Sequence, residues 1–276
     1  MRFLHLFETE TAYTEAREER YIEPWVSLTE ETKKVNYNIS EEERKEKLLN
    51  MPLTFENVGD DFPSIIWAFD DPEADKNLSF SYNDGAWEGM PAGEPSTFTL
   101  SPGDFVRFKG TNTSLFGVHI ENPDESAQFK VSGNIMSLLY GDNFSDKTEI
   151  TEDYAFGELF SSCHNLVSAE DLMLPATALA SSCYYAMFAG CISLTTAPEL
   201  PATALASSCY SFMFSGCTSL NYIKCLATNI SARNCTSNWV NGVAATGTFI
   251  KATSTDWSVK TGNDGIPAGW TVQVTN

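Results

Sequence analysis

A near-exact internal repeat constrains this chain more than any other feature. Residues 174–194 and 200–220 spell almost the same phrase, L-P-A-T-A-L-A-S-S-C followed by aromatic residues, a glycine and a second cysteine. Equivalent residues lie 26 positions apart, as Cys183 and Cys209 do. A period of this length is typical of stacked repeat units, none of which buries its apolar face alone. We therefore predict a solenoid of stacked coils in this part of the chain.

Each copy of the repeat has a regular apolar spacing. Leu179, Cys183 and Met187 recur every four residues, which predicts one face of a short helix. Gly190 follows where a helix end favours a left-handed residue, and Pro198 prevents the chain from re-entering a helix at once. One coil is therefore predicted to consist of a short helix, a turn, a short strand and a corner marked by proline.

Weaker copies flank the two strong ones. An upstream copy over residues 155–166 matches at a shift of 28 positions, and a downstream copy over 235–242 matches at a shift of 26. Residues 265–274 are predicted to form a turn and a final strand that covers the open end. We thus expect about four coils within residues 141–276, with atypical outer coils acting as caps.

All seven cysteines lie in the repeats, and six of them fall into two columns of equivalent positions. Such columns indicate small buried hydrophobic side chains that recur with each coil. A disulfide ladder is the alternative, although an odd count and three-membered columns do not pair evenly. No C-x-x-C pair occurs, so no zinc site is expected. The columns are Cys163, Cys191 and Cys217, and Cys183, Cys209 and Cys235.

The pattern M-F-x-G-C-x-S-L, which occurs at residues 187–194 and 213–220, resembles the BspA-like leucine-rich repeats. The resemblance extends over residues 154–276. It implies a leucine-rich-repeat fold for that region. Repeats of this family commonly serve in surface adhesion and recognition, so the resemblance says more about the fold than about the function.

Residues 1–50 are predicted to be an acidic anchoring extension with too few apolar residues for a core of their own. Ser40 and Glu43 form a capping-box pattern, which predicts a short helix from there to about residue 49. The aromatic side chains of the extension need a surface on which to dock. That surface is either the following domain of the same chain or another protein. The candidate anchoring residues are Phe3, Phe7, Tyr21 and Trp25.

The stretch Tyr21-Ile-Glu-Pro-Trp25-Val-Ser27, with V-N-Y-N at 35–38 and P-L-T-F at 52–55, supports a second resemblance. It looks like the leader found on proteins of Bacteroides-type gut anaerobes and of their tailed phages, including the crAss-like group. In those proteins the leader precedes a β-domain and often the same repeats. The resemblance implies a structural role in a virion, as an appendage on the head or the tail.

Residues 51–140 are predicted to form a β-sandwich. Apolar and polar residues alternate there, as in antiparallel strands with one buried face. The sequence Asn83-Asp84-Gly85 predicts a tight hairpin turn. A jelly roll and an immunoglobulin-like sandwich are both compatible with the pattern. The predicted strands span residues 53–57, 64–69, 78–83, 86–88, 97–100, 105–109, 116–120 and 128–131. Together with the repeats, they place the chain in the α+β class with mostly β structure.

The charge of the chain restricts its partners. A formal net charge of −20 and a pI near 4.4 favour solubility and disfavour nucleic acid or an anionic membrane as a partner. No stretch has the length and apolar character of a membrane span. The start at residues 1–7 is too short for a signal-peptide core, so we expect either no export by the general route or a signal that was removed.

No residue pattern points to catalysis. The three histidines, His5, His119 and His164, lie far apart in sequence, and structural roles are expected for them. The chain contains no nucleophile elbow, P-loop, dinucleotide fingerprint or zinc-protease motif. Solvated loops are the favoured interpretation of the carboxylates at 70–75 and 142–149, with calcium as the alternative. Burial, rather than stacking on a sugar, is expected of Trp87, Trp239 and Trp257.

Three functions are compatible with these features. The first is a non-enzymatic phage virion protein that anchors through its N-terminal part and presents the repeats for binding or decoration. Its partners would be other virion proteins, further copies of itself, and a glycan or protein on the host surface, with no cofactor or metal. The second is a bacterial surface or secreted adhesin. The third, a glycan-active enzyme on a β-sandwich, lacks a defensible pair of acids.

Overall fold

The computed structural model describes residues 39–70, 76–91, 93–122 and 127–275, and their fold is mostly β, as predicted. The chain divides into two compact units between Glu46 and Lys47. The predicted helix near the boundary is confirmed as α3 (Glu41–Leu49). Its capping box is present, since Ser40 N–H donates to Glu43 Oε2 at 2.8 Å and Glu43 N–H donates to Ser40 Oγ at 3.1 Å.

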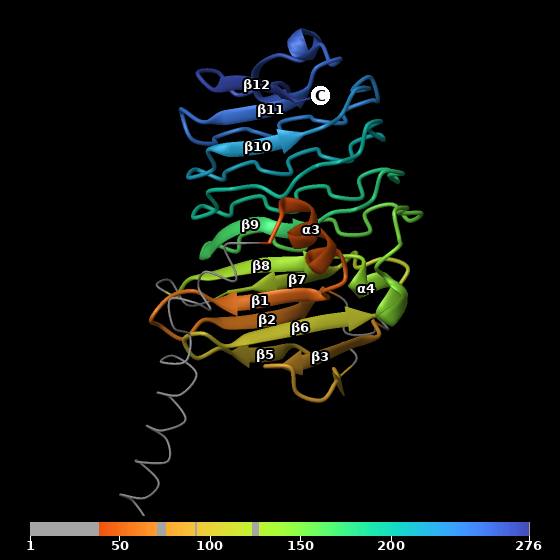
Figure 1. Cartoon of the computed structure of the whole chain (residues 1–276), viewed down its shortest axis with the longest axis vertical. Helices are drawn as coiled ribbons and strands as arrows, with labels where there is room; N and C mark the ends of the chain where they lie inside the picture. The colour runs from red at the N-terminus through yellow and green to blue at the C-terminus, as the bar shows by residue number, and fades with distance from the viewer. Residues whose placement is uncertain (1–38, 71–75, 92, 123–126, 276) are drawn as a thin grey trace, which may run out of the picture. The chain divides into compact units, whose positions relative to one another are not determined.

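Two sheets form the region that follows α3 (Figure 1). Each predicted strand overlaps an observed one. The larger sheet has the order β4-β3-β6-β1-β8-β9 and the smaller one the order β5-β2-β7. The strands are β1 (Leu53–Asn57), β2 (Ser64–Phe69), β3 (Leu78–Tyr82), β4 (Glu88–Gly89), β5 (Ser96–Thr99), β6 (Phe105–Gly110), β7 (Val118–Glu121), β8 (Phe129–Asn134) and β9 (Leu166–Met173).

The predicted hairpin turn joins β3 to β4. Asn83 and Asp84 both have positive φ angles, 48° and 58°, and Gly85 N–H donates to the Tyr82 carbonyl at 2.8 Å. Positive φ at both central residues is the geometry of a type I′ turn, which matches the twist of the strands it connects. The Asn-Asp-Gly sequence therefore forms the turn that it predicts.

Aromatic side chains pack between the two sheets. Trp67 of β2 contacts Phe108 of β6 with ring centroids 4.7 Å apart, and Phe55 of β1 contacts Phe108 at 5.5 Å. All three are fully buried. β6 alternates buried and partly buried residues, as a strand with one face on a core does. The inner faces of the two sheets thus share one core.

β9 links this region to the repeats. It pairs in parallel with β8 and also makes an isolated bridge, Ser168 to Thr196, with the next repeat. Further parallel bridges connect Thr196 to Tyr222 and Tyr222 to Thr248. One row of strand positions therefore continues from the larger sheet through successive repeats. It ends in the parallel sheet of β10 (Tyr222–Cys225), β11 (Thr248–Ala252) and β12 (Thr271–Thr275).

The helix predicted in each repeat is wrong. Residues such as 181–190 form consecutive turns, and the described helices outside α3 are short: α4 (Ser137–Tyr140), η1 (Gly141–Asn143), η2 (Trp257–Val259) and η3 (Gly262–Asp264). Every fourth residue of the turns has positive φ. These residues are Tyr154, Glu158 and Ser162; Ser182, Ala186 and Gly190; Ser208, Phe212 and Gly216; and Asn234, Asn238 and Gly242.

Alternating hydrogen bonds explain why the turns replace a helix. Tyr184 N–H and Ala186 N–H donate across to carbonyls of the next repeat, at 3.1 and 2.9 Å. The intervening Tyr185 N–H and Met187 N–H donate to carbonyls three residues earlier, at 2.9 and 3.3 Å. In an α-helix every interior N–H group donates to a carbonyl of the same helix, so none is left to bond to a neighbouring repeat. The turns instead join the repeats by backbone hydrogen bonds, but they require residues in the unfavourable left-handed conformation.

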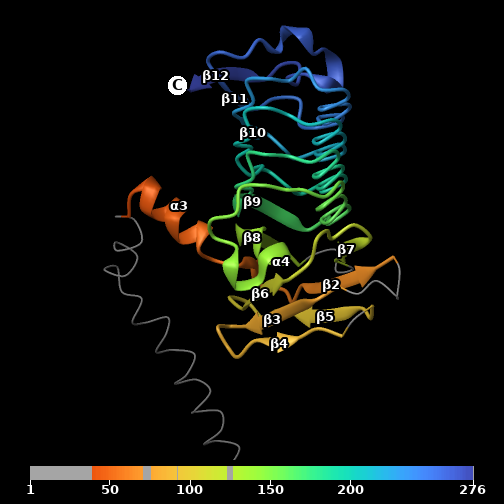
Figure 2. The ribbon, with the colours of Figure 1, turned by 90° about the vertical axis from the view of Figure 1, so that its right-hand side faces the viewer.

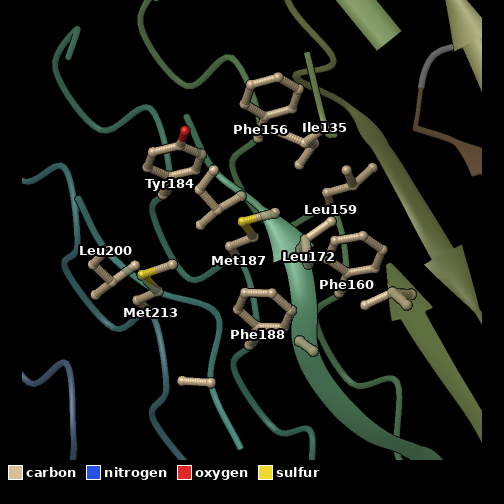
Figure 3. Close-up of a cluster of buried hydrophobic side chains, with 14 of the residues drawn as sticks. Ile135, Phe156, Leu159, Phe160, Leu172, Tyr184, Met187, Phe188, Leu200 and Met213 are labelled. Carbon is tan, nitrogen blue, oxygen red and sulfur yellow. The ribbon is translucent and has the colours of Figure 1, made fainter. Parts of the chain in front are cut away.

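Stacked aromatic rings run through the core of the repeats (Figure 3). Phe188 lies between Phe160 and Phe214, with ring centroids 5.3 and 5.7 Å away. A parallel column contains Phe156, Tyr184, Tyr210 and Trp239. Figure 2 shows the successive coils that carry these rings lying next to one another.

The predicted burial of the cysteines is confirmed. All seven thiols are buried and free. Cys191 Sγ and Cys217 Sγ each lie 3.0 Å from a backbone carbonyl, those of Phe160 and Phe188. The thiol hydrogen bonds repeat with the coil, so the column has the same local environment in successive repeats.

Candidate binding groove

All four residues of the predicted anchoring site belong to the first 38 residues of the chain. Phe3, Phe7, Tyr21 and Trp25 lie outside the described residues, as does His5. The two other histidines are brought close to one surface. That surface is a groove of about 750 Å³ between the β7 region and the first two repeats.

Four aromatic side chains form a continuous strip along the groove and onto the third repeat; we call them the aromatic strip. Phe116 contacts Tyr154 at 5.2 Å between ring centroids, Tyr154 contacts Tyr185 at 5.7 Å, and Tyr185 contacts Phe212 at 5.8 Å. Phe116 is 59% exposed and Tyr154 is 38% exposed. Large aromatic side chains left in contact with solvent along one path are a feature of ligand-binding surfaces.

Acidic side chains accompany the aromatic ones. His119 of β7 lies between two carboxylates, with Nδ1 3.3 Å from Asp70 Oδ1 and Nε2 3.2 Å from Glu121 Oε1. Glu158 and His164, both exposed, also line the groove. The charge of the two carboxylates gives this end of the groove an acidic character.

Neither proposed calcium segment assembles a site among the described residues. No group of three His, Cys, Asp or Glu side chains there is arranged to hold a metal ion. Asp142 is paired with Lys109 Nζ at 2.6 Å and Asp146 with Lys147 Nζ at 3.2 Å. Residues 71–75 lie outside the described part of the chain.

The buried thiols are poor nucleophiles. Burial raises the pKa of the Cys217 and Cys225 thiols to about 12, and it raises the pKa of Cys191 well above its usual range. Because the thiolate is the reactive form, these groups are almost entirely unreactive near neutral pH. These three thiols therefore contribute packing rather than chemistry.

The tryptophans divide between core and surface. Trp239 and Trp257 are buried and stacked on each other at 5.4 Å, as expected. The expectation of burial is wrong for Trp87, which is 38% exposed and has the Lys109 ammonium 4.2 Å above its ring. That contact shields one face of the indole by a cation–π interaction.

Sequence reasoning missed the groove because its residues come from separate segments. A signal was nevertheless present in the repeats. The two strong copies are almost identical, yet Tyr185 is matched by Ser211 and Phe212 by Ala186. Because the other copy has a small residue at each of these positions, the stacking of the repeats does not require an aromatic side chain there. Such positions are candidates for a surface role.

Comparisons with family models, curated proteins and solved structures found no match for this chain. In the part of the chain that the structure describes, no helix has the length and apolar character needed to cross a bilayer.

Proposed function

We propose that this chain is a non-enzymatic structural protein of a phage virion, a head or tail appendage that presents a repeat solenoid for binding. Residues 141–276 would be the BspA-like leucine-rich-repeat solenoid of about four coils, residues 51–140 a β-sandwich, and residues 1–50 the anchor. The resemblances of the leader and of the repeats support the assignment. The observation that carries it is the aligned stacking of equivalent residues, as in the Phe160, Phe188 and Phe214 column.

A stacked arrangement favours binding over catalysis. Repeats that bond to each other row by row expose an extended surface whose side chains vary while the core is kept. The aromatic strip lies on such a surface, at Tyr185 and Phe212, where the two strong copies differ. A virion appendage and a bacterial surface adhesin both use a surface of this kind, so the adhesin is the alternative function.

Purified particles of a suitable phage provide the test of the virion role. Mass spectrometry of such particles is expected to detect this chain in a constant ratio to the major capsid protein. Absence of the chain from particles that package DNA normally would refute the virion role. Detection on the bacterial surface in cells without phage would instead support the adhesin.

The groove is the proposed ligand site, and neutral oligosaccharides are the ligand class that fits it. Sugar rings stack their C–H faces on exposed aromatic rings such as Phe116 and Tyr154. Carboxylates such as Asp70, Glu121 and Glu158 accept hydrogen bonds from sugar hydroxyls and repel acidic sugars. The groove volume is in the range of small-ligand sites.

Binding to an array of neutral and acidic oligosaccharides, followed by calorimetry on the best neutral one, tests the groove. Tyr154→Ala is expected to weaken that affinity at least about tenfold, or about 1.4 kcal/mol, because it removes the exposed ring that contacts both Phe116 and Tyr185. Trp87→Ala is the matched control, since Trp87 is equally exposed but does not line the groove. Equal affinity of wild type and Tyr154→Ala would rule out the groove as the site.

A further inference from the structure

We propose that the outer edge of β12 pairs with β12 of a second copy of this chain, in an antiparallel, two-fold arrangement. β12 is the last strand of its sheet, and none of the described strands pairs with its outer edge. It contains no charge and no proline. Natural edge strands are commonly protected by one or the other, so an unprotected edge is suited to pairing.

The apolar face of the sheet continues uncovered at β12. In register, Ile223 of β10 lies beside Phe249 of β11, and Phe249 lies beside Val272 of β12. Ile223 and Phe249 are fully buried, whereas Val272 is 46% exposed and Val274 is 61% exposed. The row of core positions thus reaches the end of the sheet without the neighbour that covers it elsewhere.

The backbone of β12 presents its free groups at alternate residues. Thr271 N–H donates to Gly247 and the Thr275 carbonyl accepts from Thr253 N–H, so Thr271 and Thr275 turn toward the inner neighbour. Successive residues of a strand point their N–H and C=O groups to opposite sides. Val272 and Val274 therefore direct theirs to the open edge.

The sequence of β12 selects a second copy as the partner. Thr271-Val-Gln273-Val-Thr275 reads the same in both directions. When two such strands pair antiparallel about Gln273, each residue meets one of its own kind. Val272 meets Val274 of the other copy, and both have outward-directed backbone groups, which is the condition for a hydrogen-bonded pair. The valine side chains then lie on one face and cover each other.

Disulfide trapping in the full-length protein tests this arrangement. Gln273 would face its own copy as a non-hydrogen-bonded pair, with Cα atoms about 4.5 Å apart, within the range that a disulfide spans. Gln273→Cys is therefore expected to form a covalent dimer under mild oxidation. Gln128→Cys is the matched control, because Gln128 is the only other glutamine and is also exposed. The native thiols are buried and do not compete.

A second variant locates the contact. Val274→Pro removes an N–H that points outward and keeps the bonds to β11, so a protein with an unchanged melting temperature is expected. In the Gln273→Cys background it should reduce the trapping rate at least about tenfold, because proline cannot donate to the partner strand.

The outcomes separate the possible occupants of the edge. Trapping of Gln273→Cys no faster than of Gln128→Cys would overturn the proposal, as expected if another segment or another protein covers β12. Trapping that persists with Val274→Pro would place the dimer contact elsewhere and would also overturn it. The result does not depend on whether the protein belongs to a virion. If monomer and dimer coexist in solution, the yield of covalent dimer rises with the fraction of dimer present.

Discussion

At the scale of single residues, one column of the repeats is restricted to very small side chains. Ser162, Gly190, Gly216 and Gly242 occupy equivalent positions, and all have positive φ, from 62° to 80°. A Cβ added to Gly216 would lie 3.4 Å from the Gly190 Cα. Both the backbone conformation and the close approach of the neighbouring repeat therefore favour glycine here.

Gly216→Ala is expected to lower the free energy of unfolding by about 1–2 kcal/mol, since alanine is disfavoured in the left-handed region. Urea denaturation measures the change. Gly89→Ala is the control, because a Cβ there meets nothing within 4 Å and no left-handed conformation is required. A loss for Gly216→Ala no greater than for the control would contradict this account of the column.

The buried thiols make stability depend on alkaline pH. The folded-state pKa values of the Cys191, Cys217 and Cys225 thiols lie above the unfolded value of about 8.5, and those of Cys217 and Cys225 reach about 12. Below about pH 8 both states keep the thiol protons, and the thiol contribution to stability is complete. As pH rises toward the folded pKa, only the unfolded state loses protons, so the contribution is lost.

The free energy of unfolding is expected to be independent of these thiols up to about pH 8 and to fall above it, by up to about 1.4 kcal/mol per pH unit for each thiol. Urea denaturation over a pH series measures the slope. Cys217→Ala should remove the contribution of one thiol from this slope, whatever the substitution does to the free energy of unfolding near neutral pH. A slope unchanged by this substitution would show that the buried thiols do not cause the alkaline loss.

At the scale of elements, the sequence predicted the repeat and its buried columns but not the path of the chain between them. The spacing of Cys183 and Met187 fits a helix, with its period of 3.6, almost as well as a turn structure with a period of 4. Over so few residues the two periods place the same side chains inward. What decides between them is hydrogen bonding to the next repeat, as by Ala186 N–H, and this is a tertiary property.

Strand positions and turns were predicted well because local sequence determines them. The type I′ turn at Asn83 and the capping box at Ser40 each depend on a few adjacent residues. The groove was not predicted, because Asp70, Phe116 and Tyr154 meet only after the strands and repeats have assembled. Positions that are the same in both repeats indicate which side chains the stacked core requires, and positions that differ indicate where the surface can vary.

The aromatic columns are expected to hold the repeats together. Phe188 is fully buried between Phe160 and Phe214, so Phe188→Ala leaves a cavity and should lower the free energy of unfolding by about 3–5 kcal/mol. Ile192→Ala, at a position 45% exposed in the same repeat, should change it by less than about 0.5 kcal/mol. Similar losses for both variants would contradict a stabilising role of ring stacking.

At the scale of the whole unit from Lys47 onward, the two-sheet region and the repeats share structure. β8 pairs with β9, and the Ile120 N–H of β7 donates to the Leu159 carbonyl of the first repeat at 2.9 Å. Phe55 of β1 contacts Phe160 of the first repeat at 5.9 Å between ring centroids. Long repeat arrays often lose cooperativity, but a short array with a shared sheet and core is expected to keep it.

The two regions should therefore unfold in one transition. Hydrogen exchange followed by mass spectrometry, in increasing denaturant, is expected to give the same opening free energy for amides of β1 and for those of residues 184–190. Phe129→Ala, which removes a buried ring of β8 next to β9, should lower both values together. Opening of residues 184–190 while β1 stays protected would show that the repeats fold independently and that the shared sheet is only a linker.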